Sequence, residues 1–282
     1  MSMNSQYRFG TSEYDLASRT HVMGILNVTP DSFSDGGRYL DIERAIEHGQ
    51  KLVEDGADFV DVGGESTRPG SESVSNEEEM RRVIPVIESL AKKINVPISI
   101  DTYKSDVAEA ALNVGAVIVN DISAMTVDAK MASIAAKHNA SVILMHMKGT
   151  PKTMHLNPSY MNVTEEVIQF LRERIEWALK AGIKQIMIDP GIGFGKKIEH
   201  NIQLLKELKT FTSLGYPMLV GVSRKSFLGA ILNLPPGERV EGTAAAVAIS
   251  ILNGANIIRV HDVKEMKRVA MVSDALKSPH LT

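Results

Sequence analysis

Short apolar runs alternate with amphipathic segments along nearly the whole sequence. Each run is continuously apolar rather than alternating, as is typical of parallel strands covered on both faces. The eight runs are residues 21–27, 59–63, 98–101, 117–121, 141–145, 185–189, 218–221 and 257–260. We therefore predict eight buried strands.

The intervening segments carry apolar residues at helical spacing. Asp41 predicts an N-cap, and Asn162 with Glu165 predicts a capping box at the start of a later helix. Residues 76–93 are also helical in pattern but contain Pro85. We interpret this segment as one kinked helix, with a broken helix as the alternative.

Eight strands that each precede a helix are typical of a closed (β/α)₈ TIM barrel of the α/β class. An open doubly wound sheet is the alternative, but no Gly-x-Gly-x-x-Gly helix start follows the first strand. No Pro/Gly linker or composition shift divides the chain, so we predict one barrel domain over residues 21–277. Residues 1–20, which include Tyr7 and Phe9, are predicted to form a short antiparallel cover over the barrel bottom.

Polar and charged residues follow the predicted strands where they end. In such a barrel the carboxyl ends of all strands open on one mouth, so these side chains are expected to meet. The residues at or just after strand ends include Asn27, Asp101, Asn120, Met145, Asp189, Ser223, Lys225, Arg259 and His261. The pattern predicts a functional site at that mouth.

The first chemical group comprises Asp101, Asn120 and Asp189. Carboxylates accept paired N–H donors, and an asparagine amide both donates and accepts. A planar heterocycle with an amino group beside a ring N–H suits this set. The alternative is that these side chains cap the following helices or bond neighbouring backbone.

The second group is an anion site formed by Lys225, Arg259 and His261. Barrels often hold phosphate at their late strands, where arginine offers a two-pronged fork and histidine adds a donor. The alternative is a salt bridge to Asp262 or Glu265.

Two long Gly-rich segments, residues 29–37 and 63–70, lie at the predicted mouth. Such loops suit lids that close over substrates, although they can also be tolerated surface insertions. Asn27, just before the first loop, is a candidate to give one oxygen to Mg²⁺, with phosphate and water as the other ligands.

Composition narrows the class of protein. The 282 residues carry 31 Lys and Arg against 34 Asp and Glu, a net charge of −3, so we expect no general attraction to nucleic acid or anionic membranes. No segment approaches the ~20 apolar residues of a membrane span. The absence of cysteine excludes thiolate metal sites and thiol nucleophiles and fits a reducing compartment.

Several motifs resemble those of the dihydropteroate synthase family. The most specific are MGILNVTPDSFSDGG at 23–37 and DVGGESTRPG at 61–70. NDI at 120–122, DPGIGFG at 189–195, SRK at 223–225 and RVH at 259–261 follow in the family's order. The resemblance spans about residues 20–275.

The resemblance implies a transferase of folate biosynthesis, typically a homodimer in the bacterial cytoplasm. The family condenses 6-hydroxymethyl-7,8-dihydropterin diphosphate with 4-aminobenzoate and releases pyrophosphate, using Mg²⁺, and sulfonamides compete with the aminobenzoate. We further hypothesise a dissociative step through a pterin cation.

The resemblance also implies roles for individual residues. Asp101, Asn120, Met145, Asp189 and Lys225 would hold the pterin. Asn27, Arg68, Arg259 and His261 would hold the diphosphate, with Asn27 also on the metal. Phe33, Thr67, Arg68, Pro69, Phe194 and Ser226 would shape the aminobenzoate site. Asp101, Lys225, Arg259 and His261 would be the catalytic residues.

Two other functions are compatible with parts of the pattern. A pterin-dependent methyltransferase acting on methyltetrahydrofolate would share Asp101, Asn120 and Asp189 but has no need of the SRK and RVH motifs. A non-catalytic pterin-binding barrel would be expected to have lost the cationic group.

Overall fold

The computed structural model describes residues 5–29, 37–67 and 70–277. Its centre is a sheet of eight parallel strands in the order β8-β7-β6-β5-β4-β3-β10-β9. A parallel bridge between Ile188 and Met218 joins the two outer strands, and Ile188 N–H donates to Pro217 O at 3.0 Å. The sheet is therefore closed, and the prediction of a (β/α)₈ barrel is confirmed.

The barrel strands have nearly the predicted bounds. They are β3 His21–Asn27, β4 Phe59–Gly63, β5 Ile98–Asp101, β6 Ile118–Asp121, β7 Ser141–Met145, β8 Ile186–Asp189, β9 Leu219–Val220 and β10 Ile257–Val260. Five match the prediction at both ends, and β6, β8 and β9 are shorter by one or two residues.

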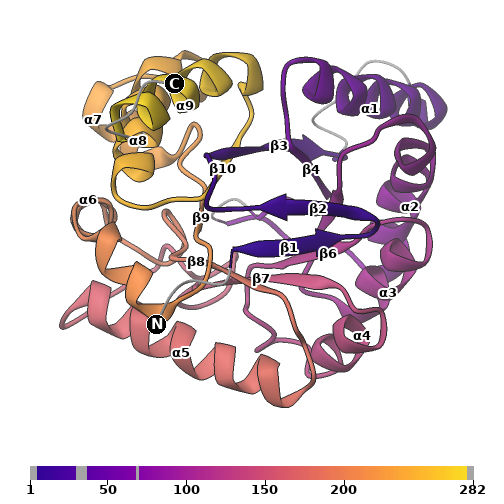
Figure 1. The fold of residues 1–282 in the computed structure, drawn as a ribbon, viewed down its shortest axis with the longest axis horizontal. Coiled ribbons are helices and arrows are strands. Elements are labelled where there is room, and N and C mark those ends of the chain that lie inside the picture. Colours follow the sequence, from indigo (N-terminus) through magenta and orange to yellow (C-terminus); the bar gives the residue numbers. More distant parts are fainter. Residues whose placement is uncertain (1–4, 30–36, 68–69, 278–282) are drawn as a thin grey trace.

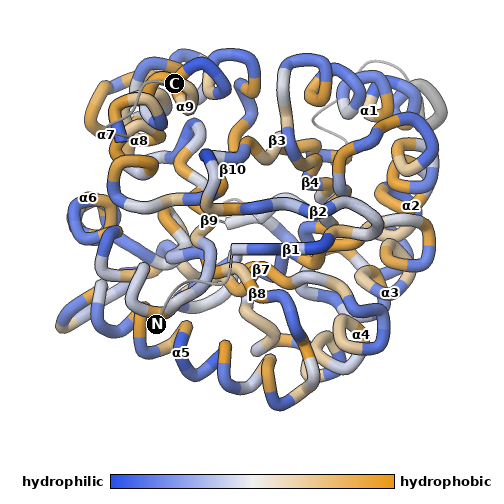
Figure 2. Tube along the Cα trace, in the orientation of Figure 1, coloured by the Kyte–Doolittle hydropathy of each residue, from blue (hydrophilic) through white to orange (hydrophobic). Residues whose placement is uncertain are grey.

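Helices surround the barrel (Figure 1). The α-helices of the described chain are α1 Gly37–Glu54, α2 Asn76–Lys93, α3 Ser105–Asn113, α4 Met131–Lys137, α5 Val163–Lys180, α6 Ile198–Lys206, α7 Ser226–Leu232, α8 Val240–Leu252 and α9 Val263–Lys277. Two 3₁₀ segments, η2 Leu208–Leu214 and η3 Pro236–Glu238, complete them. Hydrophobic and hydrophilic residues alternate along many of the helices (Figure 2), so that one side of each can pack on the barrel.

A two-stranded antiparallel hairpin covers the N-terminal end of the barrel. Its strands, β1 (Gln6–Phe9) and β2 (Ser12–Asp15), cross the front of the view in Figure 1. The hydroxyl of Tyr7 donates to Ile186 O at the start of β8, and Tyr7 and Phe9 pack with the first residues of several barrel strands. The predicted cover is therefore present, while the domain division at residue 20 stays a prediction.

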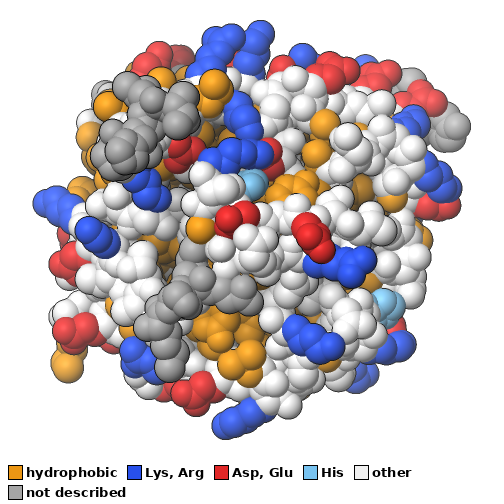
Figure 3. Space-filling view, viewed as in Figure 1, with side chains coloured by type: hydrophobic (Ala, Val, Ile, Leu, Met, Phe, Trp, Pro, Cys, Tyr) orange, Lys and Arg blue, Asp and Glu red, His pale blue; other side chains and the backbone are white. Residues whose placement is uncertain are grey.

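The outer surface on this side of the molecule is mixed in charge. Lys and Arg side chains are interspersed with Asp and Glu over the described residues that Figure 3 shows. No helix in the described ranges combines the length and hydropathy needed to cross a membrane.

Predictions about helix ends were less accurate. Helix α1 begins at Gly37, so Asp41 is not its N-cap; a cap preference of ~1 kcal/mol does not stop a helix from extending in the N-terminal direction. Asn162 caps α5 as predicted, but the carboxylate that accepts from the backbone N–H of Asn162, at 3.3 Å, belongs to Glu166 and not to Glu165; the same oxygen accepts from Met161 N at 2.7 Å.

Helix α2 resolves the question of the proline within residues 76–93. It is a single helix from Asn76 to Lys93 that includes Pro85, so the broken-helix alternative is wrong. The side chain of Ser75 caps it by accepting from Glu78 N at 3.2 Å.

Candidate active site

The register of the sheet places several predicted site residues at one level of the barrel. Asn27 pairs with Gly63, Gly63 with Asp101, and Asp101 with Asn120 on successive strands. Farther round, Met145 pairs with Asp189. The structure therefore brings these strand-end residues to the same mouth, as predicted.

Arg259 is the central cation of this site. Its Nε lies 2.5 Å from Asp61 Oδ2 and its Nη2 lies 2.6 Å from Asp101 Oδ2, so the side chain extends from β10 past β3 to β4 and β5. Asn120 Nδ2 donates to the same Asp61 oxygen at 3.0 Å. Two carboxylates thus hold the guanidinium, and the Asn120 amide holds one of these carboxylates; the Arg259 side chain is 19% exposed.

The two carboxylates each retain a free acceptor. Asp61 Oδ1 and Asp101 Oδ1 are buried and have no hydrogen-bond partner in the described part of the chain. A buried acceptor without a donor costs about 1–3 kcal/mol, and such atoms in native proteins call for an explanation. A ligand with N–H groups, such as the predicted heterocycle, would satisfy them.

Sequence reasoning gave no role to Asp61, which is completely buried. The sequence nevertheless marks Asp61 as unusual, because it is the one charged residue in the otherwise apolar strand Phe59–Gly63. A charge inside a buried strand requires a partner, and here the partner is Arg259.

Burial shifts the pKa values of the titratable groups around Arg259. It raises the pKa of Asp101 to about 7 against the pull of Arg259, and raises that of Asp189 to about 6. Burial lowers the pKa of Lys225 to about 8, with Arg259 adding to the effect. Burial alone would lower the pKa of Arg259, but Asp61 and Asp101 outweigh it, so this group stays charged.

Lys225 and Phe194 line the other side of the mouth. Lys225 Nζ lies 4.0 Å from the centre of the Phe194 ring, within the range of a cation–π contact. Phe194 packs in a buried apolar cluster with Met145. Asp189 Oδ1 accepts from Gly191 N at 2.7 Å. Charged and flat apolar groups therefore adjoin, as a planar polar ligand requires.

The turn that presents Phe194 is held by a buried lysine that was not predicted. Lys196 Nζ donates to Gly191 O at 2.8 Å and Phe194 O at 3.0 Å, and lies 2.9 Å from His146 Nδ1. Gly191 has φ +69°, and a Cβ there would lie 1.8 Å from His146 O. The turn therefore requires glycine and is pinned against the strand β7 side of the mouth.

His261 lies directly after β10 and contacts Ser223. The Ser223 hydroxyl is 3.0 Å from His261 Nδ1. Burial, reinforced by Arg259, lowers the pKa of His261 to about 3, so the imidazole is neutral and offers a hydrogen-bond donor rather than a charge. The alternative pairing of Arg259 with Asp262 is wrong, because Asp262 instead accepts from Arg224 Nε at 3.0 Å.

A second buried ionic group anchors the loop after β4. We call Glu65, Glu79, Tyr103 and Lys104 the Glu65 cluster. Lys104 Nζ lies 2.7 Å from Glu65 Oε2, 2.6 Å from Glu79 Oε2 and 2.7 Å from Val74 O. Tyr103 donates to Glu65 Oε1 at 2.5 Å.

The Glu65 cluster, together with Arg82, holds both ends of the segment that carries Thr67. Val74 N donates to Glu65 Oε2 at 2.9 Å, and Arg82 Nη1 donates to Gly64 O at 2.8 Å. The sequence did not indicate this cluster, because two of its members lie in or near helices with ordinary surface patterns. Thr67 itself is half-buried.

The remaining predicted residues are less completely placed. Ser226 is exposed at the first position of α7, next to Lys225. Phe33, Arg68 and Pro69 lie outside the described residues.

Asn27 fits a magnesium ion only as one ligand among several. Its side chain is half-buried and has no hydrogen-bond partner among the described residues. Over the same ranges, no group of three or more His, Asp or Glu could hold a metal. Mg²⁺ commonly takes one or two protein oxygens plus substrate phosphates and water, so the fit depends on a bound diphosphate.

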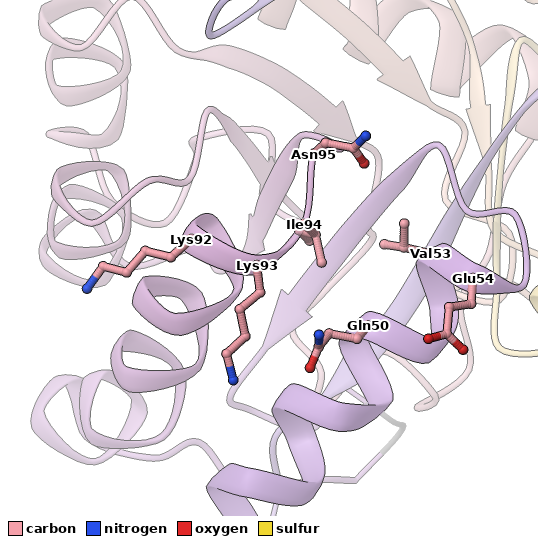
Figure 4. Close-up of a pocket in the computed structure, with 7 residues that line it drawn as sticks. All are labelled: Gln50, Val53, Glu54, Lys92, Lys93, Ile94 and Asn95. Atoms are coloured by element: carbon pink, nitrogen blue, oxygen red, sulfur yellow. The ribbon is translucent and has the colours of Figure 1, made fainter.

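A pocket of about 520 Å³ lies away from these strand ends, between the C-terminal ends of α1 and α2 (Figure 4). It is lined by Gln50, Val53, Glu54, Lys92, Lys93, Ile94 and Asn95. None of these seven is a predicted site residue, so the pocket does not alter the placement of the site.

Comparison with known proteins identifies the family. The sequence model of the family described as pterin binding enzyme matches residues 23–261. The fold and the site thus define a pterin-binding barrel enzyme. A dihydropteroate synthase of Bacillus subtilis is 49% identical over 260 residues, covering 92% of this chain and 89% of the relative. This chain belongs to the dihydropteroate synthase family.

Solved structures of dihydropteroate synthases are similar to this chain over nearly its whole length. The Xanthomonas albilineans dihydropteroate synthase with 4-aminobenzoic acid is 43% identical, with a TM-score of 0.92 and coverage of 98% of this chain and 99% of that one. The Yersinia pestis enzyme in a sulfonamide drug complex is 43% identical, with a TM-score of 0.91 and coverage of 96% and 99%.

Proposed function

We propose that this chain condenses 6-hydroxymethyl-7,8-dihydropterin diphosphate with 4-aminobenzoate to give 7,8-dihydropteroate and pyrophosphate. The observation that carries the proposal is the buried Asp61–Arg259–Asp101 group, with a free carboxylate oxygen on each side of a permanent cation. It offers acceptors to a pterin and positive charge to a diphosphate. The 4-aminobenzoic acid and sulfonamide in the related structures support the second substrate.

In this proposal the pterin ring lies across the strand ends. Its N–H groups donate to Asp101 Oδ1 and to Asp189, while the Asn120 amide and Lys225 bond to ring acceptors. Met145 packs against the ring, beside Phe194. These groups come from β5, β6, β7 and β8 and from the N-terminal end of α7, so the barrel itself fixes their spacing.

The reacting carbon is the methylene between the pterin ring and the diphosphate. Its C–O bond breaks, and the electron pair leaves with the diphosphate, which Arg259, the His261 ring and Arg68 hold. The cation left behind is delocalised over the dihydropterin ring and stabilised by the ionised Asp101. The aryl amine then forms the C–N bond and releases one proton, for which pyrophosphate or water is the acceptor.

The aminobenzoate site is proposed to comprise Phe33, Thr67, Arg68, Pro69, Phe194 and Ser226. The Glu65 cluster holds Thr67 near the mouth from one side, and Lys196 holds Phe194 from the other. The main requirement for formation of the C–N bond is then that the weakly basic amine of 4-aminobenzoate lies next to the pterin cation. A sulfonamide that matches the aminobenzoate in shape is expected to compete for this site.

The assay that tests the function measures pyrophosphate released from the pterin diphosphate with and without 4-aminobenzoate. Release is expected to depend on the aminobenzoate, and Lys225→Ala is expected to lower kcat/KM about 100-fold because a charged pterin contact is lost. Pyrophosphate release that does not depend on 4-aminobenzoate would exclude the assignment.

The dissociative step has a separate test. Rapid-quench experiments with the pterin diphosphate alone should show cleavage of the C–O bond, and the absence of cleavage would favour direct displacement.

The methyltransferase alternative gains no support from the site. Its reaction releases no pyrophosphate, and it leaves unexplained why Arg259 and His261 adjoin the pterin acceptors. Corrinoid-dependent methyl transfer without pyrophosphate release would reverse this choice.

The pKa values predict a bell-shaped pH profile of kcat/KM. Asp101 must be ionised to accept the ring N–H, so activity should rise with pH through about 7; Lys225 must be protonated, so activity should fall above about 8. Lys225→Arg should remove the alkaline limb, because arginine stays charged. An alkaline limb unchanged in that variant would contradict the assignment.

We also propose that Mg²⁺ is bound jointly by Asn27 and the substrate diphosphate. When bound, the ion neutralises charge on the leaving group. Calorimetric titration of Mg²⁺ should show strong binding only when pyrophosphate is present, and chelation should abolish turnover reversibly. Tight Mg²⁺ binding to the ligand-free protein would contradict a site with one protein ligand.

A homodimer is proposed from the distribution of exposed apolar side chains. Within the described residues, seven of the twelve large ones lie on the neighbouring helices α7, α8 and α9 (Figure 1). They are Ile231, Leu232, Ile249, Leu252, Met271, Val272 and Leu276. An apolar patch of this kind is typical of a subunit interface.

Sedimentation analysis should give a dimer for the wild type and a monomer for Val272→Glu. Met161→Glu, a charge at an exposed apolar position outside the patch, is the matched control and should remain dimeric. A monomeric wild type would exclude the proposal.

A cytoplasmic location is proposed because a chain without cysteine suits a reducing compartment.

A further inference from the structure

Ser223 makes two hydrogen bonds to the same histidine. Its hydroxyl oxygen accepts from the backbone N–H of His261 at 3.2 Å and lies 3.0 Å from His261 Nδ1. The serine is 5% exposed and follows β9, the neighbour of the strand that ends before His261. The contact therefore joins two adjacent strand ends at the mouth of the barrel.

Counting protons shows which atom donates in the contact between Ser223 and the ring. A hydroxyl has one hydrogen and two acceptor positions, and a neutral imidazole has one N–H and one acceptor nitrogen. If Nδ1 carried the ring proton, both histidine groups would donate to the serine, and the hydroxyl hydrogen would need another acceptor. Ser223 Oγ has no further partner within the described residues. Buried hydroxyls rarely leave their hydrogen unbonded, so Ser223 donates to Nδ1 and the ring proton is on Nε2.

The opposite ring nitrogen is available to a ligand. His261 Nε2 makes no hydrogen bond to the described part of the chain and is not among its enclosed, unpartnered atoms. Because burial and Arg259 keep the pKa of the ring low, His261 is neutral and has a single N–H. The position of that one proton therefore decides whether the ring can donate to an anion at the mouth.

The turn that carries Ser223 is itself braced. Arg224 has the left-handed φ of +57°, its N–H donates to Thr243 Oγ1 at 3.1 Å, and its guanidinium pairs with Asp262. Asp262 directly follows His261, so a salt bridge and a serine hold adjacent residues of the same segment. This bracing gives the hydroxyl a fixed direction toward Nδ1.

We propose that Ser223 is a positioning residue that selects the Nε2–H tautomer of His261 and so presents one hydrogen-bond donor to the diphosphate of the substrate. The identity of the anion rests on the function proposed above, whereas the tautomer does not. Ser223 acts through His261 and touches no reacting atom.

Nitrogen-15 NMR of the histidine side chains tests the tautomer directly. Wild type and Ser223→Thr, which keeps the hydroxyl, should show His261 with an unprotonated Nδ1 and a protonated Nε2. Ser223→Ala should show a mixture of the two tautomers. A wild-type ring protonated at Nδ1, or a tautomer unchanged in Ser223→Ala, would overturn the proposal.

Inorganic pyrophosphate with Mg²⁺ is the probe for the binding consequence. Ser223→Ala should weaken its binding about tenfold, the usual effect of one lost hydrogen bond to an anion, while Ser223→Thr should stay within about threefold. KM should rise for the pterin diphosphate and not for 4-aminobenzoate. Ser250→Ala, which alters a buried serine in α8, is the control for stability and should bind as wild type.

Amide replacements provide a second test that does not depend on the stability of Ser223→Ala. In His261→Gln the amide nitrogen can occupy the place of Nε2, whereas in His261→Asn it can reach only the place of Nδ1. The glutamine variant should therefore bind pyrophosphate more tightly than the asparagine variant. Adding Ser223→Ala to His261→Gln should weaken binding no further, since the serine acts through the ring.

Equal binding by Ser223→Ala and wild type, or a full tenfold loss on the glutamine background, would overturn the inference. Absence of aminobenzoate-dependent pyrophosphate release in the wild type would instead overturn the proposed function. The NMR result would still decide the role of Ser223 in that case.

Discussion

Arg259→Ala is expected to lower kcat/KM for aminobenzoate-dependent pyrophosphate release by about 10³-fold or more. The guanidinium is proposed to hold the leaving diphosphate and also holds Asp101, the carboxylate assigned to the pterin cation. One substitution thus removes a transition-state contact and displaces another, which together are worth several kcal/mol. Steady-state kinetics with Arg259→Lys as the charge-conserving variant separates charge from the two-pronged geometry.

The free energy of unfolding should also be lower in Arg259→Ala than in the wild type. Without Arg259, Asp61 and Asp101 remain as two buried carboxylates with no cation, a change that typically costs about 3–5 kcal/mol. Burial already raises the pKa of Asp101 to about 7, and removing the cation should raise it further above that of the unfolded chain. The folded state then binds more protons, so the loss should be larger at pH 8 than at pH 5.

Urea unfolding at the two pH values measures this loss. Arg224→Ala is the matched control, because it removes an arginine from a partly exposed pair with Asp262 and should cost about 1 kcal/mol or less. If activity in Arg259→Ala stayed within tenfold of wild type, the central role assigned to this residue would be wrong.

Lys104→Met is expected to destabilise the fold by about 3–5 kcal/mol. Lys104 is the single lysine that bridges Glu65 and Glu79, whose side chains are only 5% and 1% exposed. Methionine has a similar length but no charge, so two buried carboxylates lose their compensation while the packing is largely kept.

Lys51→Met is the control for Lys104→Met and is expected to have little effect on stability. Lys51 pairs with Asp55 at 2.9 Å, but its side chain is 58% exposed, and such helical surface pairs contribute about 0.3–0.5 kcal/mol. Unfolding midpoints that fall equally in the two variants would show that burial of the Glu65 cluster has no special cost. We also expect KM for 4-aminobenzoate to rise in Lys104→Met, because the cluster anchors the loop that carries Thr67.

Local patterns predicted the strands well and the helix starts poorly. A strand buried on both faces must be apolar throughout, so residues such as Leu26 and Ile143 mark it without ambiguity. The start of a helix depends on preferences of ~1 kcal/mol that the following residues can override. Asp41 inside α1 and Glu166 in place of Glu165 are examples.

The sequence by itself determined the barrel and the set of polar groups at its mouth. The strand periodicity required eight buried strands, and the position of Asp101, Asn120 and Asp189 at strand ends required that they meet, because closure brings all carboxyl ends together. The reaction itself was predicted only from the motifs that resemble those of the dihydropteroate synthase family.

Only the tertiary structure decided which charges pair. Arg259 reaches Asp61 across 198 residues of sequence, and Ser223 reaches His261 across 38. Such pairings depend on strand register and side-chain direction, which hydrophobic patterns do not specify, since they record only whether a residue is buried. The same reason explains why the contacts of the Glu65 cluster and of Lys196, which lie within or beside the motifs, became visible only in the folded chain.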